Sequence, residues 1–371
     1  MKKKRVSVWI QGGIGGGLFS QGFPAIQQQI KRLAARYDVD IYSQLPANSD
    51  FIPEGFRFYT LNRKVKSGAL RWIYLLLIFL YQHIRRPYKV LFGFWGYPAG
   101  AITVALGKIF RRPSIVSLHG GDSVCIPSIP YGVFCDPGRT KICRWAYAHS
   151  TVLLTVSQYQ ASVLKQYGIT KTPRVIPYGT DPAIFPFKEK RFDAPVVRFI
   201  HIGNHTPIKD QRTLLQAFSI VTKNIPAKLT IVGPDFFGGQ LKMWSIELGI
   251  ENHVDFVEPL PNGRLFEYYH QADIMLHTSL YEAQGLVFTE AAGCGTLLAG
   301  TRVGQLADMG DTRGIIVEPG EAALLAQKII DALVSPEYIY TMRMAAFQWA
   351  QQFNADYTEQ ELTNIIDKLS S

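Results

Sequence analysis

Two acidic residues eight positions apart, Glu282 and Glu290, stand in the part of this chain whose residue types could do most chemistry. A helix is predicted to begin after Gly285, and at about 1.5 Å of rise per residue eight positions span about 12 Å. The first N–H groups of that helix, on Leu286 and Val287, have no acceptor within it and favour a bound anion. Two acidic groups with an anion site between them match the two ends and the charged middle of a nucleotide-diphospho-sugar.

The stretch Ser279–Gly304 carries a longer pattern, E-x7-E followed by Gly-Cys-Gly. This pattern resembles the signature of the retaining glycosyltransferases of family 4, which have the GT-B fold; they often read EGFG or EGQG where this chain reads EAQG. The resemblance implies that Glu282 orients the hydroxyl groups of the donor sugar, that Glu290 binds the ribose, and that Gly285 and the two following amides bind the diphosphate. The spacing alone is also that of two solvated charges on a surface helix.

The length of 371 residues favours two domains, each large enough to bury its own core. The four cysteines form no C-x2-C pair and have no histidine at metal-ligand spacing, so neither a zinc site nor an oxidising compartment is indicated. They are Cys125, Cys135, Cys143 and Cys294. The apolar run Val6–Ile10 is too short for a signal peptide, and the longest apolar run, Trp72–Tyr81, is half the length of a membrane span.

Positive charge is concentrated in the first half of the chain. Residues 1–185 hold 24 Lys and Arg against 7 Asp and Glu, whereas the remainder holds 15 against 22. The basic half indicates an anionic partner, either nucleic acid or an anionic membrane surface. The segment Arg71–Arg86, apolar with basic residues at both ends, is either a buried helix or an interfacial helix lying on a membrane.

The first half alternates strands and helices. It begins with the strand Val6–Ile10, the glycine-rich loop Gly12–Gly17, the helix Pro24–Tyr37 and the strand Val39–Tyr42. This order is typical of a doubly wound sheet, in which glycines let a ligand approach the backbone closely. In the family 4 resemblance, Gly16 and Gly17 match the glycine pair that approaches donor and acceptor.

His119 directly follows the predicted strand Ser114–Leu118 and precedes two glycines and Asp122. Open α/β sheets bind ligands at the carboxyl ends of their strands, so this histidine is placed for a role in a site. The stretch resembles the H-G-x-D motif of the same family, which implies that His119 contacts the donor sugar from the first domain. A lone histidine is more often structural, and that alternative stays open.

The second half restarts the alternation after a segment rich in proline and charge, Phe185–Pro195, which we expect to be a linker. The strand Val197–Ile202 then leads into a loop at 203–210. In the family this loop commonly reads G-R-L-x-P-x-K-G, whose Arg and Lys bind the donor's diphosphate. Lys209 matches the lysine, whereas Asn204 stands at the arginine position. Phosphate binding would therefore depend more on Lys209 and on the helix N-terminus.

The fold class expected is α/β, with two doubly wound Rossmann-like domains facing across a cleft, as in GT-B. Residues 1–185 would form the acceptor-binding domain, 196–345 the nucleotide-sugar-binding domain, and 346–371 a helical segment returning to the first domain. The resemblance implies a retaining, metal-independent glycosyltransferase with a nucleotide-diphospho-sugar as co-substrate and no other cofactor. No D-x-D-like pair stands at a strand end of the second domain, which agrees with a site without a metal.

Two other functions fit parts of the sequence. A nucleotide-sugar epimerase shares the fold, but the basic, acceptor-sized first domain argues against it. A nucleic-acid-binding protein would explain the basic half, but its Lys and Arg are not interleaved with aromatic residues in any recognition module, so no nucleic acid partner is expected. We expect a cytoplasmic enzyme that associates with the inner face of the cell membrane and builds cell-envelope polysaccharide or lipopolysaccharide on a glycan or lipid-linked acceptor. The nucleotide, the sugar and the acceptor stay open.

Overall fold

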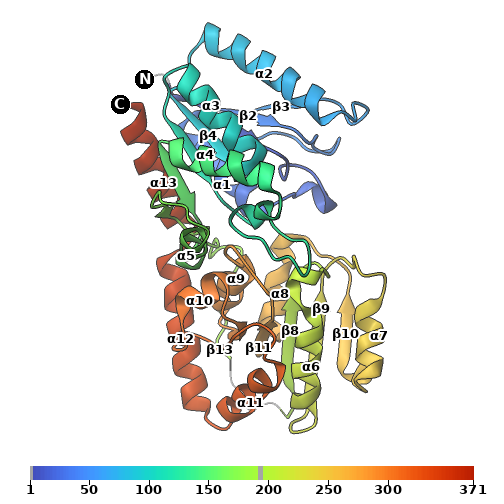
Figure 1. Cartoon of the computed structure of the whole chain (residues 1–371). Helices are drawn as coiled ribbons and strands as arrows, with labels where there is room; N and C mark the ends of the chain where they lie inside the picture. Colours follow the sequence, from blue (N-terminus) through green and yellow to red (C-terminus); the bar gives the residue numbers. More distant parts are fainter. Residues whose placement is uncertain (1–2, 191–194) are drawn as a thin grey trace. The chain divides into compact units, whose positions relative to one another are not determined.

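Two parallel β-sheets organise the chain, and each belongs to its own structural unit (Figure 1). The computed structural model describes residues 3–190 and 195–371. The first unit consists of Met1–Pro177 with Ala355–Ser371, and the second of Tyr178–Asn354. The predicted α/β class with two parallel-sheet domains is confirmed. The chain passes from the first unit to the second after Pro177, before the expected end of the first domain at 185.

The sheet of the first unit has seven strands in the order β3-β2-β1-β4-β5-β6-β7, all paired in parallel. The strands are β1 (Arg5–Ile10), β2 (Asp38–Ser43), β3 (Arg57–Tyr59), β4 (Val90–Phe94), β5 (Ser114–Ser117), β6 (Val152–Thr155) and β7 (Arg174–Val175). Every residue of β1, β4 and β5 is buried, as expected for central strands covered on both faces. The strand order reverses between β1 and β4, which is where open α/β sheets form a ligand-binding crevice.

The helices of the first unit bury one apolar face each against this sheet. They are α1 (Pro24–Arg36), α2 (Gly68–Arg85), α3 (Ala101–Ile109), α4 (Pro137–His149), α5 (Gln158–Gln166) and α13 (Ala355–Ser370). An aromatic cluster holds α2 in place: the ring of Phe79 stacks on Tyr88 at 5.3 Å and lies 5.4 Å from Trp9, which stacks on Tyr42 at 4.6 Å. Large rings dominate this core because each buries far more apolar area than an aliphatic side chain.

The C-terminal helix α13 is part of the first unit and packs against α1. The Oγ1 of Thr358 donates to the carbonyl oxygen of Pro177 at 2.7 Å, and the hydroxyl of Tyr37 donates to the carbonyl oxygen of Thr363 at 3.3 Å. Arg32 forms an ion pair of 3.0 Å with Glu359. The chain thus rejoins the first unit at Ala355, later than the residue 346 expected from the sequence.

The second unit has a six-stranded parallel sheet in the order β10-β9-β8-β11-β12-β13. The strands are β8 (Val197–Ile202), β9 (Ala227–Val232), β10 (Val254–Val257), β11 (Ile274–His277), β12 (Leu297–Thr301) and β13 (Ile315–Val317). The helices are α6 (Gln211–Thr222), α7 (Gln240–Glu247), α8 (Leu265–Gln271), α9 (Leu286–Gly293), α10 (Gly304–Met309), α11 (Ala322–Leu333) and α12 (Pro336–Gln352). Two apolar clusters in this unit share the residues of β8, β11 and β12 between them, so these central strands are buried on both faces.

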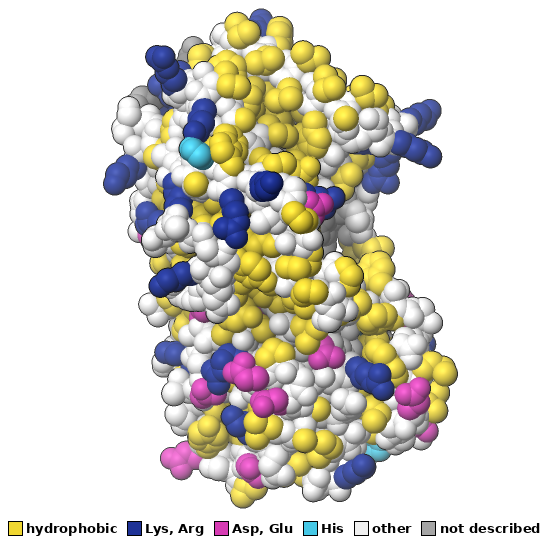
Figure 2. Space-filling view, viewed as in Figure 1, with side chains coloured by type: hydrophobic (Ala, Val, Ile, Leu, Met, Phe, Trp, Pro, Cys, Tyr) yellow, Lys and Arg dark blue, Asp and Glu magenta, His cyan; other side chains and the backbone are white. Residues whose placement is uncertain are grey.

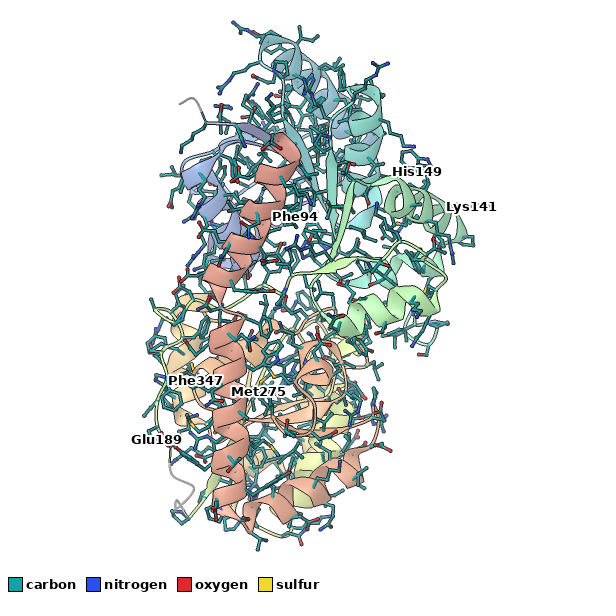
Figure 3. All side chains as sticks on the ribbon, turned by 90° about the vertical axis from the view of Figure 1, so that its left-hand side faces the viewer. Phe94, Lys141, His149, Glu189, Met275 and Phe347 are labelled. Atoms are coloured by element: carbon teal, nitrogen blue, oxygen red, sulfur yellow. A yellow bond between two sulfur atoms is a disulfide. The ribbon has the colours of Figure 1, made fainter. Side chains whose placement is uncertain are left out.

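The segment predicted as a linker packs on the second unit up to Lys190. Phe185 is 3% exposed in its core, and the ring of Phe187 lies 4.4 Å from that of Phe347 on α12 (Figure 3). The ammonium group of Lys190 donates to the carbonyl oxygen of Tyr269 at 2.5 Å. The prediction of a linker was wrong for 185–190, because proline and charge hid two aromatic anchors in the segment; residues 191–194 lie outside the described part of the chain.

Cys125 and Cys135 form a disulfide in the loop between β5 and α4, whereas Cys143 and Cys294 are free and buried. The cysteine spacing gave no sign of this pair. Within residues 3–190 and 195–371, no group of three or more His, Cys, Asp or Glu is arranged to hold a metal ion. In the same ranges, no helix combines the length and the apolar character needed to cross a bilayer.

Candidate functional site

The carboxyl ends of two neighbouring strands, β8 and β11, bring the predicted residues of the second unit together. The loop after β8 carries Lys209 in a short 3-10 helix, and the loop after β11 carries Glu282 just before α9. Because the two strands pair in parallel, their following loops leave the sheet at the same edge. The hydroxyl of Thr278 ties these loops together, since it donates to the carbonyl oxygen of Asp210 at 2.9 Å.

Glu282 lies at the centre of a buried polar cluster. Its Oε1 accepts hydrogen bonds from Nζ of Lys209, from Nε2 of His277 at 3.0 Å and from Oγ of Ser279 at 2.7 Å. All three bonds end on Oε1, and within residues 3–190 and 195–371 no donor bonds to Oε2, which keeps its lone pairs for a ligand. Burial alone would raise the pKa of Glu282, but the charge of Lys209 and the bond from His277 hold it well below its usual range. Glu282 is therefore ionised at neutral pH.

Sequence reasoning missed His277, which ends the apolar strand β11 and is completely buried. Its ring stacks at 5.1 Å on that of His201, whose Nδ1 lies 3.0 Å from the carbonyl oxygen of Leu276. Desolvation lowers the pKa of both histidines, so both rings are neutral at pH 7. A polar residue at the carboxyl end of an otherwise apolar strand was the signal available in the sequence.

The N-terminus of α9 presents free backbone donors beside this cluster. Gly285 precedes it with a φ of +77°, and a Cβ there would meet the ring of Phe288 at 2.5 Å, so only glycine fits. The first helical bond is donated by Phe288 to the carbonyl oxygen of Gly285. Among the described residues, the N–H groups of Leu286 and Val287 have no acceptor. They form, with the nearby charge of Lys209, a site for a phosphate group.

Glu290 lies on α9, eight residues after Glu282, and is only 6% exposed. Its Oε2 accepts from the hydroxyl of Tyr269 at 2.9 Å, and its Oε1 accepts from Nδ2 of Asn262 at 3.3 Å. Burial raises the pKa of Glu290 to about 7, and these two hydrogen bonds only reduce the effect. No cation contributes to this balance, so the site holds a carboxyl group that would gain from further hydrogen-bond donors.

The loop after β8 also borders a small cavity of about 130 Å³. Its lining includes His205, Asp235, Phe256 and Glu258. Asn204, beside it in the sequence, is exposed, and its carbonyl oxygen accepts from Nε2 of Gln211 at 2.9 Å. His205 is 5% exposed, and its Nδ1 lies 3.6 Å from Oδ1 of Asp235. Sequence reasoning found Asn204 but missed this cavity, which depends on the close approach of two loops.

In the first unit, His119 follows β5, as predicted. Its ring stacks at 5.2 Å on Phe94, a buried residue of β4 (Figure 3), and meets the ring of Trp95 edge-on at 5.8 Å. Desolvation lowers the pKa of His119 to about 3, so the imidazole is neutral at pH 7. The carboxyl group of Asp122, 2% exposed, accepts from the backbone N–H groups of His119 and Gly96, both at 3.0 Å, and thus fixes the loop.

A cavity of about 510 Å³ lies in the first unit beside this loop. It is lined by Gln11, Gly12, Gly13, Phe23, Leu45, Trp95, Tyr97, Gly121, Asp122, Pro130, Gly132, Val133 and Arg139. The glycines of the first loop that line it are Gly12 and Gly13. The predicted pair stands further along: the carbonyl oxygen of Gly16 accepts from the N–H of Gly22, and Gly17, with φ of +74°, has open space where a Cβ would be. Gly16 and Gly17 therefore do not border this cavity.

Two protein-family models divide the chain. The model described as "Glycosyl transferases group 1" matches residues 185–349, and that described as "Glycosyltransferase Family 4" matches residues 25–184. Together they cover residues 25–349, which include His119, Lys209, Glu282 and Glu290 but not the glycine-rich loop Gly12–Gly17.

Similar proteins include a D-inositol 3-phosphate glycosyltransferase from Corynebacterium jeikeium, 26% identical over 73% of this chain and 69% of the relative. Among solved structures, the sucrose-phosphate synthase of Thermosynechococcus elongatus superposes with a TM-score of 0.81 over 99% of both chains, at 20% identity. The Anabaena protein HepE, solved with UDP and glucose, superposes with a TM-score of 0.76 over 98% of this chain and all of its own, at 19% identity. At such identities the structural likeness shows the fold alone.

Proposed function

The chain belongs to the glycosyltransferases of group 1 and family 4, with the GT-B fold, and from that premise we propose that it transfers a sugar from a nucleotide-diphospho-sugar with retention of the anomeric configuration. The observation that carries this proposal is the arrangement around α9. The stretch from Glu282 to Glu290 supplies an ionised carboxylate, two free backbone N–H groups and a buried carboxyl group without a counter-charge. The loop beside it adds the ammonium group of Lys209.

The donor would bind the second unit along this arrangement. Lys209 and the N–H groups of Leu286 and Val287 would hold the diphosphate, because they supply positive charge and donors at one place. Glu290 would accept hydrogen bonds from the ribose hydroxyls, and the open Oε2 of Glu282 would accept one from the transferred sugar. The UDP bound by HepE supports a nucleoside diphosphate as the ligand of this fold.

The reaction would proceed by attack of an acceptor hydroxyl on the same face of the sugar that the phosphate leaves. The bond from the anomeric carbon to the phosphate oxygen breaks, the bond to the acceptor oxygen forms, and the departing phosphate takes the acceptor's proton. The protein's main task is then to stabilise charge on the leaving diphosphate, which Lys209 and the two amides would do without a metal. Glu282 would keep Lys209 in place through Oε1 while it orients the sugar through Oε2. The neutral His119 would hydrogen-bond a sugar hydroxyl from the first unit.

The acceptor would bind the first unit and carry negative charge. This unit holds 25 Lys and Arg against 10 Asp and Glu, whereas the second holds 14 against 19. The names of two similar proteins, an inositol 3-phosphate glycosyltransferase and a sucrose-phosphate synthase, also refer to phosphorylated sugars or polyols. The cavity beside Trp95, Tyr97 and Arg139 combines aromatic faces with one guanidinium group, which suits an anionic glycan or the head of a lipid-linked one. Assembly of cell-envelope polysaccharide or lipopolysaccharide is the setting we propose.

A panel of nucleotide-diphospho-sugars tests this function. The purified protein is incubated with each donor, and release of nucleoside diphosphate is followed by chromatography, with Lys209→Ala as the matched inactive variant. We expect slow, Lys209-dependent release from at least one donor, faster when an anionic acceptor is added, and an unchanged anomeric configuration by NMR. Conversion of a donor into its epimer without release of nucleotide would contradict the proposal, as would an inverted product.

A further inference from the structure

Helix α2 has two apolar faces, and only one of them is buried. Leu75, Phe79 and His83 point into the core of the first unit. The opposite face carries a continuous stripe of large apolar side chains at helical spacing that are between 53% and 77% exposed. The stripe consists of Leu70 (55%), Ile73 (53%), Leu77 (61%), Tyr81 (55%) and Ile84 (77%). Single exposed apolar residues need no explanation, but five in register along an 18-residue helix indicate an interaction surface.

The stripe lies in a part of the chain without negative charge. Residues 55–121 contain eleven Lys and Arg and not one Asp or Glu. The basic residues are Arg57, Arg63, Lys64, Lys66, Arg71, Arg85, Arg86, Lys89, Lys108, Arg111 and Arg112. Figure 2 shows hydrophobic side chains gathered over the region where Figure 1 draws α2, with Lys and Arg around the edge.

Basic side chains are held at both ends of the stripe. At its N-terminal end, Nε of Arg71 donates to the carbonyl oxygen of Val65 at 2.8 Å, which fixes the segment of Lys64 and Lys66 beside the first turn. At its C-terminal end, the ring of His83 lies 4.6 Å from that of Phe110. That contact brings the end of α3, with its exposed basic residues, beside the end of α2. These residues are Lys108 and Arg111, and Arg85 ends α2 itself.

Several basic residues of the first unit are neutralised by carboxylates, whereas five at the ends of the stripe are not. The carboxylates of α13 pair with the basic residues around α1, as in Lys4–Asp367 at 3.3 Å and Arg36–Glu359 at 2.9 Å. Arg57 is paired in the same way with Asp38 at 2.7 Å. At the C-terminal end of the stripe Arg86 pairs with Asp38 at 2.5 Å, but in the described part of the chain no carboxylate pairs with Lys64, Lys66, Arg85, Lys108 or Arg111. These five charges, which have no carboxylate partner, lie at the two ends of α2.

We infer that α2 docks this protein onto an anionic membrane surface. The helix lies in the plane of the interface, with Leu70, Ile73, Leu77 and Ile84 in the headgroup boundary and the flanking Lys and Arg on lipid phosphates. An apolar stripe alone would suit a protein partner equally well. The ring of unpaired positive charge selects the anionic bilayer, because the charge faces outward at both ends of the stripe. Tyr81, with the guanidinium group of Arg85 5.1 Å over its ring, provides an amphipathic side chain at that boundary.

Docking is independent of catalysis, so it is tested without donor or acceptor. The full chain is sedimented with vesicles of phosphatidylcholine alone and with vesicles containing a third of phosphatidylglycerol, at low and high salt. We expect binding that requires the anionic lipid and weakens as salt rises. The double substitution Lys64→Gln/Lys66→Gln should lower the partition coefficient of the protein between anionic vesicles and solution about 25-fold, at about fivefold per basic residue. Ile73→Gln with Leu77→Gln should lower it at least tenfold.

Matched controls come from the second unit, where Ile246 and Val334 are 59% and 81% exposed. Ile246→Gln with Val334→Gln should leave vesicle binding unchanged. Nucleoside-diphosphate release from a soluble donor should be the same in all variants, which separates docking from the proposed reaction. Equal binding to neutral and anionic vesicles, or no binding to either, would overturn the inference. So would an Ile73→Gln/Leu77→Gln variant that binds vesicles as the wild type does but no longer self-associates.

Discussion

Glu290→Gln should stabilise the fold at pH 8 and lose that advantage at pH 4.5. The reason is that Glu290 is buried without a cation, and its pKa is raised to about 7 from an ordinary value of 4.5. A carboxyl group whose folded pKa lies above its unfolded pKa holds its proton more tightly in the folded state. Its contribution to the free energy of unfolding therefore falls as pH rises from 4.5 to 7, and the full penalty is present above pH 7.

The size of the effect follows from the two pKa values. A difference of about 2.5 at about 1.36 kcal/mol per pKa unit gives about 3 kcal/mol. Glutamine keeps the shape of the side chain but offers one acceptor oxygen to two donors, the hydroxyl of Tyr269 and the amide of Asn262. The substitution therefore also lowers the free energy of unfolding by about 1 kcal/mol at every pH. The informative quantity is the change between the two pH values, which cancels that constant loss. Cys294 and Tyr269 beside it stay protonated throughout, because burial raises the pKa of Cys294 to about 12 and raises that of Tyr269 well above its ordinary value.

Urea unfolding measured from pH 4.5 to 8.5 checks this prediction. The variant's gain in free energy of unfolding should grow by about 3 kcal/mol across that range, with most of the change between pH 5 and 7. Glu247→Gln, which removes a carboxylate from the exposed surface of α7, is the matched control and should show a flat difference. The same Glu290 variant should bind donor more weakly, since the ribose loses a charged acceptor. Parallel pH curves for wild type and Glu290→Gln would refute the reasoning.

Further substitutions test the rest of the site. Lys209→Ala should raise the barrier by about 2–4 kcal/mol, so that kcat/KM falls by a factor of about 30 or more, and an unchanged kcat/KM would exclude its role. Glu282→Gln should mainly lower kcat, because Oε2 no longer orients the sugar; equal kcat with a raised KM would contradict this. Asn204→Arg should tighten donor binding, measured by calorimetry, since it restores a cation that the family usually has; weaker binding would argue against a phosphate near that loop. Gly285→Ala should destabilise the fold by about 1–3 kcal/mol in urea unfolding, because φ is +77° and a Cβ would meet Phe288; a change within about 0.5 kcal/mol would show that the turn can relax.

Much of the fold could be predicted from the sequence, because strands of parallel sheets are continuous apolar runs and the glycine-rich turns between them are local signals. The helix after Gly285 and the strand before His119 are examples. The segment 185–190 was misread, because proline and charge are also local signals, and they conceal the burial of Phe185 against a distant helix. The passage between units falls at Pro177, in the stretch 174–182, where no boundary was predicted from the sequence.

The candidate site could be predicted residue by residue but not as a network. Lys209 and Glu282 were assigned to different parts of the donor, and only the pairing of β8 with β11 shows that they form one ion pair. His277 and Tyr269 hold the two acids in place, yet His277 ends an apolar strand and Tyr269 lies in a short helix of mixed composition, and neither position stands out in the sequence. Positioning residues of this kind depend on contacts between distant segments, which a single sequence does not display.

Titration calorimetry of nucleoside diphosphates into the full chain tests the central claim, that the edge of the second sheet binds a nucleotide-diphospho-sugar. We predict saturable binding of UDP or another nucleoside diphosphate that is weakened at least tenfold by Lys209→Ala and by Glu290→Gln, while Glu247→Gln binds as the wild type does. Binding that is unaffected by both substitutions, or the absence of binding for every nucleoside diphosphate tested, would contradict the account.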